Sequence, residues 1–323
     1  MKAFFYLLSL PYFIASKIRS FGYKKKIFKI YKVNKPVVSI GNISVGGTGK
    51  TPFCLELIKL CLQKNLLPAL ISRGYGNDES KIYQNRFPQI PMLFSGNRVK
   101  ASKKLIEDHP SLSVIILDDA YQHQKIHRNI NILLVNAMDP YGHHFCLPRG
   151  FLRESLTAIN RADLVILTHA DEINTFEKES IASKILFYAG KKIPISEATH
   201  EPDYLLSPNG EKTSFSSFNA KYQDKVAILS GIAHPEGFIK TLKKCDVSSI
   251  KHFIYPDHYQ YLSNDFKIIA KERKYFDCLI TTEKDIVKIP LETKRELNIY
   301  TLVMKMNISD PEKILDLIKE QIK

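Results

Sequence analysis

The chain has 323 residues, of which 44% are apolar and 25% are charged, and it is long enough for two globular domains. Its five cysteines are scattered without a CxxC pair, which excludes a disulfide framework and a zinc ribbon and fits a reducing compartment. The net charge is +14, and the first 35 residues carry nine lysines and arginines and no carboxylate. A nucleic-acid-binding protein would spread such charge over a folded face, so this class is disfavoured.

The N-terminal arm, residues 1–34, joins an apolar stretch from Ala3 to Ala15 to a run of basic residues. The stretch is shorter than the roughly 20 apolar residues of a membrane-spanning helix, and Pro11 interrupts it. A cleaved signal peptide has a similar apolar length, but export would separate the nucleotide site that follows from its ATP. We therefore expect a membrane-associating helix, with leucines and aromatic rings among the lipid headgroups and lysines against anionic lipid. A helix packed on the protein, followed by a solvated basic tail, is the alternative.

Residues 37–53 read VVSIGNISVGGTGKTPF, a β-branched run that opens into glycines. The run Val37–Ile40 suits a buried strand, and the apolar spacing after residue 52 indicates a helix, whose N-terminus favours an anion. Glycines let the backbone turn successive N–H groups toward one phosphate, Lys50 brings a positive charge, and Thr51 offers a hydroxyl to Mg2+. Ser44 stands where the strict pattern has glycine, and an ordinary glycine-rich turn is the alternative. We predict an ATP-binding phosphate loop made of Ser44, Val45, Gly46, Gly47, Thr48, Gly49, Lys50 and Thr51.

Further apolar runs alternate with helical patterns along the chain. The runs are Pro68–Ser72, Val114–Leu117, residues 129–137 and residues 162–170, and Val99–Asp108 has helical spacing. This alternation predicts a P-loop NTPase-type α/β core over residues 35–198, a doubly wound parallel sheet with helices on both faces. The polar stretch 196–222 indicates a linker or β-ribbon. Three later strand-to-loop transitions predict a smaller C-terminal α/β domain within residues 199–323.

Two carboxylates, Asp118 and Asp119, directly follow the apolar run Val114–Leu117. A carboxylate at the end of such a strand, downstream of a phosphate loop, binds or orients Mg2+ directly or through water. The sequence leaves open which of the two contacts the metal, and a solvated turn is the alternative. His123 and His127 are four residues apart but lack a third ligand, so we assign no zinc.

Eight segments resemble, in the same order, the tetraacyldisaccharide 4'-kinase family of lipid A synthesis. They are GNISVGGTGKTP (41–52), SRGYG (72–76), GNR (96–98), DDAYQH (118–123), LPRGFLRES (147–155), SGIAHPEGF (230–238), PDHYQY (256–261) and TTEKDIVK (281–288). The family's phosphate loop likewise lacks glycine at the position of Ser44. The chain departs from the family's pattern at Ala120 and Ala233, which replace glycines, and at Asn77–Glu79, which corresponds to the acidic GDE segment without its glycine.

The resemblance implies an enzyme that transfers the γ-phosphoryl group of ATP, with Mg2+, to the 4'-hydroxyl of a tetra-acylated glucosamine disaccharide 1-phosphate, giving lipid IV-A. It implies a peripheral protein on the cytoplasmic face of the inner membrane. From the basic arm we expect an anionic lipid surface as partner and no nucleic acid, and we infer no obligate protein partner. The resemblance further implies contacts with substrate or phosphate for four basic side chains, Arg73, Arg98, His123 and Arg153.

The resemblance also implies the catalytic residues. Its GDE and PDH segments pair Asp78 with His258 as the group that accepts the proton of the 4'-hydroxyl, and Lys50 and Asp119 complete the set. A membrane-associated P-loop ATPase that works as a switch, without a lipid acceptor, is the alternative function. That function would leave the DDAYQH, PDHYQY and TTEKD segments without a role.

Overall fold

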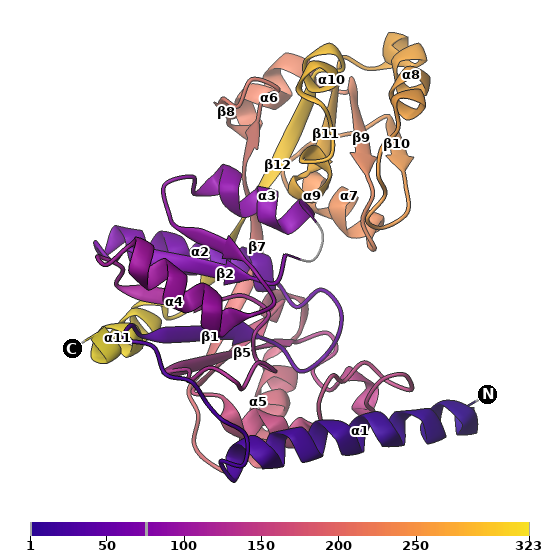
Figure 1. Cartoon of the computed structure of the whole chain (residues 1–323). Coiled ribbons are helices and arrows are strands. Elements are labelled where there is room, and N and C mark those ends of the chain that lie inside the picture. Colours follow the sequence, from indigo (N-terminus) through magenta and orange to yellow (C-terminus); the bar gives the residue numbers. More distant parts are fainter. Residues whose placement is uncertain (1, 75–76, 323) are drawn as a thin grey trace. The chain divides into compact units, whose positions relative to one another are not determined.

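The computed structural model describes residues 2–74 and 77–322 (Figure 1). The chain divides into two compact units, each assembled from separate stretches. The first unit comprises Met1–Tyr75, Phe87–His200 and Met306–Lys323, and the second comprises Gly76–Arg86 and Glu201–Lys305. These units differ from the consecutive parts expected at 35–198 and 199–323, because residues 76–86 join the second unit and the C-terminal segment joins the first. The boundaries predicted for the arm (1–34), the core (35–198) and the C-terminal domain (199–323) stay a prediction.

The first unit is built on a parallel sheet whose strands are short, apolar and largely buried. In chain order they are β1 (Val37–Gly41), β2 (Pro68–Ser72), β3 (Met92–Phe94), β4 (Val114–Leu117), β5 (Ile130–Asn136), β6 (Leu164–Thr168) and the beginning of β7 (Ile195–Leu206). Side by side their order is β7-β6-β5-β1-β4-β2-β3, with Val38 of β1 opposite Ile116 of β4 and Ile130 of β5. Near-continuous apolar runs are typical of parallel strands covered on both faces. The strands expected from the sequence in this unit are confirmed.

Helices cover both faces of this sheet. They include α2 (Lys50–Gln63), α4 (Arg98–Asp108), α5 (Thr175–Ala189) and α11 (Pro311–Ile322). The connection β1-α2-β2 runs toward one edge of the sheet, whereas β3-α4-β4 and β6-α5-β7 run toward the other. Because such connections are right-handed, α2 lies on one face and α4 and α5 lie on the opposite face. Leu105 of α4 packs in one buried cluster with Ile115 of β4, and Ile185 of α5 packs in another with Leu133 of β5.

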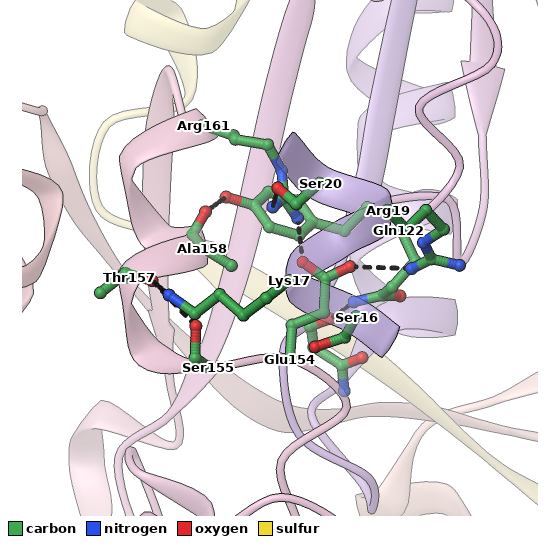
Figure 2. A network of polar contacts seen from close by, with 12 residues as sticks. Ser16, Lys17, Arg19, Ser20, Gln122, Glu154, Ser155, Thr157, Ala158 and Arg161 are labelled. Atoms are coloured by element: carbon green, nitrogen blue, oxygen red, sulfur yellow. Dashed lines mark hydrogen bonds and ion pairs between the residues drawn. The ribbon is translucent and has the colours of Figure 1, made fainter. Parts of the chain in front are cut away.

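The N-terminal helix α1 (Lys2–Lys24) is fastened to the first unit by a buried carboxylate (Figure 2). The Glu154 side chain, only 3% exposed, accepts hydrogen bonds from Arg19 Nη2 at 3.1 Å and from Arg161 Nη2 at 2.5 Å. Lys17 Nζ adds a hydrogen bond to Thr157 Oγ1 at 2.7 Å. The Arg161–Glu154 pair is the buried one, since Arg161 is 15% exposed and Arg19 is 46% exposed. Arg19 and Lys17 thus connect α1 to a charged pair inside the core.

Helix α1 also exposes large apolar side chains to solvent. They are Leu8, Leu10, Tyr12, Ile14, Ile18 and Phe21, each at least 40% exposed. Across residues 2–74 and 77–322, no helix combines the length and the apolar character that crossing a membrane requires. Charged residues of α1 therefore bind the protein, while much of its apolar surface stays uncovered.

The second unit also contains parallel strands. Its strands are β9 (Val226–Ser230), β10 (Lys251–Ile254), β11 (Cys278–Thr282) and β12 (Ile299–Ile308), in the order β10-β9-β11-β12. Its helices are α3 (Asn77–Arg86), α6 (Phe215–Tyr222), α7 (Pro235–Lys243), α8 (Ser263–Lys271), α9 (Glu283–Ile286) and α10 (Leu291–Glu296). The three expected strand-to-loop transitions are confirmed at β9, β10 and β11. The stretch 196–222 is partly a ribbon, because β7 pairs antiparallel with β8 (Lys212–Thr213), but it ends in α6, which its polar composition did not reveal.

Candidate active site

The predicted phosphate loop lies between β1 and the N-terminus of α2. Gly46 and Gly49 adopt φ values of +109° and +75°, a left-handed backbone that other residues rarely adopt. The loop is braced at Val45, whose N–H donates to the Phe151 carbonyl oxygen at 2.7 Å. At the start of α2, Pro52 has no N–H and the Phe53 N–H donates to the Gly49 carbonyl oxygen at 3.0 Å, which leaves the N–H groups of Lys50 and Thr51 without a carbonyl of the helix to bond. The segment therefore forms a cradle for an anion.

The other residues of the loop either brace it or open onto it. Ser44 forms an isolated bridge with Leu152, and Thr48 accepts a hydrogen bond from Asn42 Nδ2 at 2.8 Å. Gly47 has open space beside it, since a Cβ added there would meet no atom within 4 Å. Lys50 and Thr51 begin α2. The ammonium and hydroxyl groups assigned to phosphate and Mg2+ thus belong to the first turn of the helix.

His200 packs against the loop, and no pattern in the sequence indicated this contact. A Cβ added to Gly49 would lie 2.8 Å from His200 Cε1 and 3.1 Å from Met306 Cε, so only glycine fits beside the imidazole. Burial, together with His169, lowers the pKa of His200 to about 4, and the ring is neutral at pH 7. Because the ring is neutral, the positive charge at the loop comes from Lys50 and from the N-terminus of α2.

Asp119 lies beside the loop in a charged cluster with two cations. It has a φ of +46° and accepts hydrogen bonds from Arg153 Nη1 at 2.8 and 3.0 Å, and Lys50 Nζ lies 3.7 Å from its Oδ1. Burial works against the charged carboxylate, but Lys50 and Arg153 outweigh it and hold the pKa of Asp119 below its usual value. The structure thus brings together three predicted residues: Lys50 of the loop, Asp119 after β4, and Arg153 of the LPRGFLRES segment.

Asp118 contacts different residues from those that contact Asp119. It is 6% exposed and accepts hydrogen bonds from Ser72 Oγ at 3.1 Å and from Cys54 Sγ at 3.6 Å. The described residues hold no group of three His, Cys, Asp or Glu side chains placed to enclose a metal ion. A Mg2+ ion is commonly held by one or two carboxylates together with water and substrate phosphates, and it needs no such group. The oxygens of Thr51, Asp118 and Asp119 therefore have the donor chemistry that suits Mg2+.

Arg98 braces the turn that carries the two aspartates. It is 2% exposed and donates to two backbone carbonyl oxygens, from Nη1 to Ser95 and from Nη2 to Asp118 at 3.1 Å. Burial lowers the pKa of Arg98, and Asp118 and Asp119 oppose that effect. The contacts of Arg98 are thus with protein backbone, and its expected contact with substrate or phosphate stays a prediction.

His123 and Arg73 are the remaining predicted basic residues. His123 Nε2 is buried without a hydrogen-bond partner, and burial and Arg98 lower the pKa of His123 to about 4. Arg73 follows β2 and is exposed. Tyr75 and Gly76, which complete the SRGYG segment, lie outside the described residues.

Asp78 and His258, far apart in the sequence, lie together in the second unit. Asp78 is in the first turn of α3 and its carboxylate is 8% exposed, whereas His258 follows β10 at a φ of +58° with an imidazole 57% exposed. His258 Nδ1 lies 3.6 Å from Asp78 Oδ2. The carboxylate is therefore largely shielded from water, and the imidazole beside it faces solvent.

Lys288 completes this second cluster, and the sequence analysis did not single it out. Its side chain is 2% exposed, and Nζ lies 3.4 Å from Asp78 Oδ2 and 3.4 Å from Asp285 Oδ1. Asp285 also accepts hydrogen bonds from the Gly231 N–H at 3.0 Å and from Thr282 Oγ1 at 2.8 Å. One buried ammonium thus compensates two buried carboxylates. The only sequence signal was its position in the TTEKDIVK segment.

Comparisons with known proteins agree on one family. A family model described as tetraacyldisaccharide-1-P 4'-kinase matches residues 1–85 and 77–323. A tetraacyldisaccharide 4'-kinase of Desulfatibacillum aliphaticivorans is 33% identical over 98% of this chain and 91% of the relative, and one of Elusimicrobium minutum is 31% identical over 99% and 91%. A crystal structure of LpxK from Aquifex aeolicus in complex with ATP superposes with a TM-score of 0.81 at 27% identity, covering 100% of this chain and 99% of that one.

We expect Lys288→Met to lower the free energy of unfolding by about 3–5 kcal/mol, because it leaves two carboxylates buried without their cation. Urea denaturation followed by circular dichroism measures the change. Lys267→Met, on an exposed position of α8, is the matched control and should change stability by no more than about 0.5 kcal/mol. A loss below about 1 kcal/mol in Lys288→Met would show that the ammonium does not compensate Asp78 and Asp285.

Proposed function

The chain belongs to the tetraacyldisaccharide 4'-kinase family, and we propose that it carries out this reaction of lipid A biosynthesis with the two clusters described above. The γ-phosphoryl group of ATP moves to the 4'-hydroxyl of tetraacyldisaccharide 1-phosphate. The bond from the γ-phosphorus to the bridging oxygen breaks, a bond to the 4'-oxygen forms, and ADP leaves with the electron pair. The observation that carries the proposal is the placement of Lys50 and Arg153 on Asp119 beside a glycine-rich helix N-terminus.

In this proposal the first unit binds the phosphates of ATP. The loop amides and the N-terminus of α2 bind phosphate oxygens, and Lys50 and Arg153 neutralise the charge that is shared over the transferred group. Asp119 holds both cations in place, since it contacts each of them. Thr51 and one of the two aspartates would hold Mg2+. When bound, this ion would neutralise part of the negative charge of the β- and γ-phosphates.

The second unit supplies the proton acceptor. A sugar hydroxyl is a weak nucleophile, so a positioned carboxylate that accepts its proton assists the transfer. Asp78 takes this role, because it is shielded from water and Lys288 fixes one of its oxygens. His258 orients Asp78 or shares the proton. The rival function, an ATPase switch without a lipid acceptor, gives this cluster nothing to do and is not favoured.

Nucleotide turnover should depend on the lipid acceptor. We expect ADP to form at a rate at least about 100-fold higher with tetraacyldisaccharide 1-phosphate than without it, since a kinase needs the 4'-hydroxyl as nucleophile. Lys50→Ala should remove transfer, because the phosphates lose a cationic partner. A coupled ADP assay and detection of the phosphorylated lipid measure both effects. Acceptor-independent turnover would support the switch, and near-normal transfer in Lys50→Ala would refute the role of the loop.

Asp78 and His258 should act as one unit. Asp78→Ala and His258→Ala are each expected to lower kcat by at least about 100-fold while the affinity for ATP stays within about twofold. The double variant should be scarcely slower than the slower single variant, because residues that share one task are non-additive. Steady-state kinetics with a nucleotide-binding measurement tests this. Fully multiplicative losses would show two independent roles, and wild-type kcat in Asp78→Ala would exclude it as the base.

We further propose that the protein is peripheral on the cytoplasmic face of the inner membrane and that α1 binds the lipid surface. Two features support this proposal. Large apolar side chains of α1 are exposed, and the arm of residues 1–34 carries basic residues without a carboxylate. Apolar insertion combined with attraction to anionic lipid is the usual basis of interfacial binding.

Replacing two exposed apolar residues of α1 should release the protein from vesicles. We expect the double variant Ile14→Ser and Ile18→Ser, at positions 46% and 62% exposed, to bind phosphatidylglycerol vesicles at least about tenfold more weakly in a sedimentation assay. The double variant Ile254→Ser and Ile268→Ser removes similarly exposed isoleucines, 60% and 47%, from the second unit and serves as the control. Equal sedimentation of both variants with the wild type would place the membrane contact elsewhere.

A further inference from the structure

We propose that Asp285 is a positioning residue for Asp78 and His258 and that it acts on each of them by a separate route. That pair is the proton acceptor of the proposed function, on which this role of Asp285 rests. Asp285 lies in α9 and is 0% exposed. A side chain that water does not reach does not contact the acceptor or the nucleotide, so any effect of Asp285 on the transfer passes through its neighbours.

The first route is the ammonium group of Lys288. Its Nζ lies 3.4 Å from Asp285 Oδ1 and 3.4 Å from Asp78 Oδ2. The three side chains are at most 8% exposed, and charges that are shielded from water interact more strongly than charges at the surface. Asp285 thus attracts the ammonium from one side while the ammonium holds Asp78 on the other. Without the charge of Asp285, Lys288 would have Asp78 as its one carboxylate in this cluster.

The second route is the backbone of Gly231, which follows β9. The Gly231 N–H donates to Asp285 Oδ2 at 3.0 Å, and the Gly231 carbonyl oxygen accepts from the His258 N–H at 3.2 Å. The same N–H of His258 also donates to Oδ1 of Asp257 at 3.1 Å. A hydrogen bond to an ionised carboxylate is roughly twice as strong as one between neutral groups. The carboxylate of Asp285 therefore holds the backbone segment that in turn holds His258.

The surroundings of Gly231 leave this backbone little room to move. A Cβ added there would lie 3.1 Å from Tyr261 Oη, 3.2 Å from Asp285 Oδ1 and 3.2 Å from the Pro256 carbonyl oxygen. Burial and Asp285 raise the pKa of Tyr261, so its hydroxyl stays protonated at pH 7. Glycine is thus the residue that fits between Asp285 and the loop that carries His258.

The carboxylate of Asp285 is itself fixed by Thr282, the residue that caps α9. Thr282 Oγ1 donates to Asp285 Oδ2 at 2.8 Å and accepts from the Asp285 N–H at 3.2 Å. Oδ1 then contacts Lys288 and Oδ2 contacts the Gly231 N–H, so one side chain serves both routes. A carboxylate that only stabilised the fold is the alternative role.

A double-variant cycle in kcat separates the two roles. We expect Asp285→Asn, which keeps the shape of the side chain and removes its charge, to lower kcat by at least about tenfold while the affinity for ATP stays within about twofold. In the Asp78→Ala background the same change should lower kcat further by no more than about twofold, because residues that act through one group are non-additive. A purely structural role predicts the same loss in both backgrounds.

Gly231→Ala tests the second route. Its added methyl group crowds Asp285 and the Pro256 carbonyl oxygen, and the loop that carries His258 has to shift. We expect kcat to fall by at least about tenfold in the wild-type background and by no more than about twofold in the His258→Ala background. If Asp285→Asn fails to fold, this variant decides.

Phe218→Leu is the control for a loss of stability. Phe218 is fully buried in α6 of the same unit, so the smaller side chain should lower the melting temperature, and kcat should stay within about twofold of the wild type.

The imidazole of His258 provides a readout that does not depend on kinase activity. In NMR spectra of the full chain labelled with 15N-histidine, its signals are those that His258→Ala removes. Asp285→Asn and Gly231→Ala should shift these signals, and Phe218→Leu should leave them in place. The proposal is overturned if both variants keep the wild-type kcat, if their losses are the same in every background, or if the His258 signals do not move. A wild type without acceptor-dependent transfer would instead refute the proposed function, and the His258 signals would then decide about Asp285 by themselves.

Discussion

Three carboxylates that are buried or partly buried are each paired with cations, and these pairings organise this molecule. Asp119 is met by Lys50 and Arg153 beside the phosphate loop, and Asp78 is met by Lys288 in the second unit. In the third, Glu154 lies between Arg19 and Arg161. Because an uncompensated buried charge costs several kcal/mol, each cluster fixes the orientation of its side chains. In two of the three clusters, the groups so fixed are those to which the proposed phosphoryl transfer assigns a task.

The pairing of buried charge also explains why α1 is held through charged residues while many of its apolar residues stay exposed. Its charged residues reach inward to Glu154 and Thr157, and Phe13 packs against the buried cluster that contains Leu133. Its apolar residues, such as Ile14 and Ile18, are then left exposed. A helix held by an ion pair and a hydrogen bond on one side can leave apolar side chains exposed on the other, which the proposed contact with lipid requires.

Backbone geometry sets the other condition for the site. Parallel strands bring their carboxyl ends to one edge of the sheet, so the loop after β1 and the aspartates after β4 become neighbours. Glycine is needed where the loop turns left-handed, and at Gly49 it is also needed because the His200 ring leaves no room for a Cβ. His200 and Lys288 show that side chains outside the recognisable motifs shape the site as much as the motif residues do.

The strands of both units, the family and the predicted phosphate loop could all be proposed from the sequence alone, and the structure and the comparisons confirm the strands and the family. These follow from local signals, namely β-branched runs, glycine spacing and motifs in a fixed order. The sequence also indicated Asp78 and His258, but only through resemblance, since no local pattern links residues so far apart. The tertiary structure was needed to show that residues 76–86 join the second unit, that Asp118 and Asp119 contact different partners, and that Arg98 contacts backbone. It alone revealed Lys288 and the contact between Gly231 and Asp285. The reason is physical: burial and pairing of charge depend on segments distant in the chain, and no local propensity encodes which cation a given carboxylate will meet.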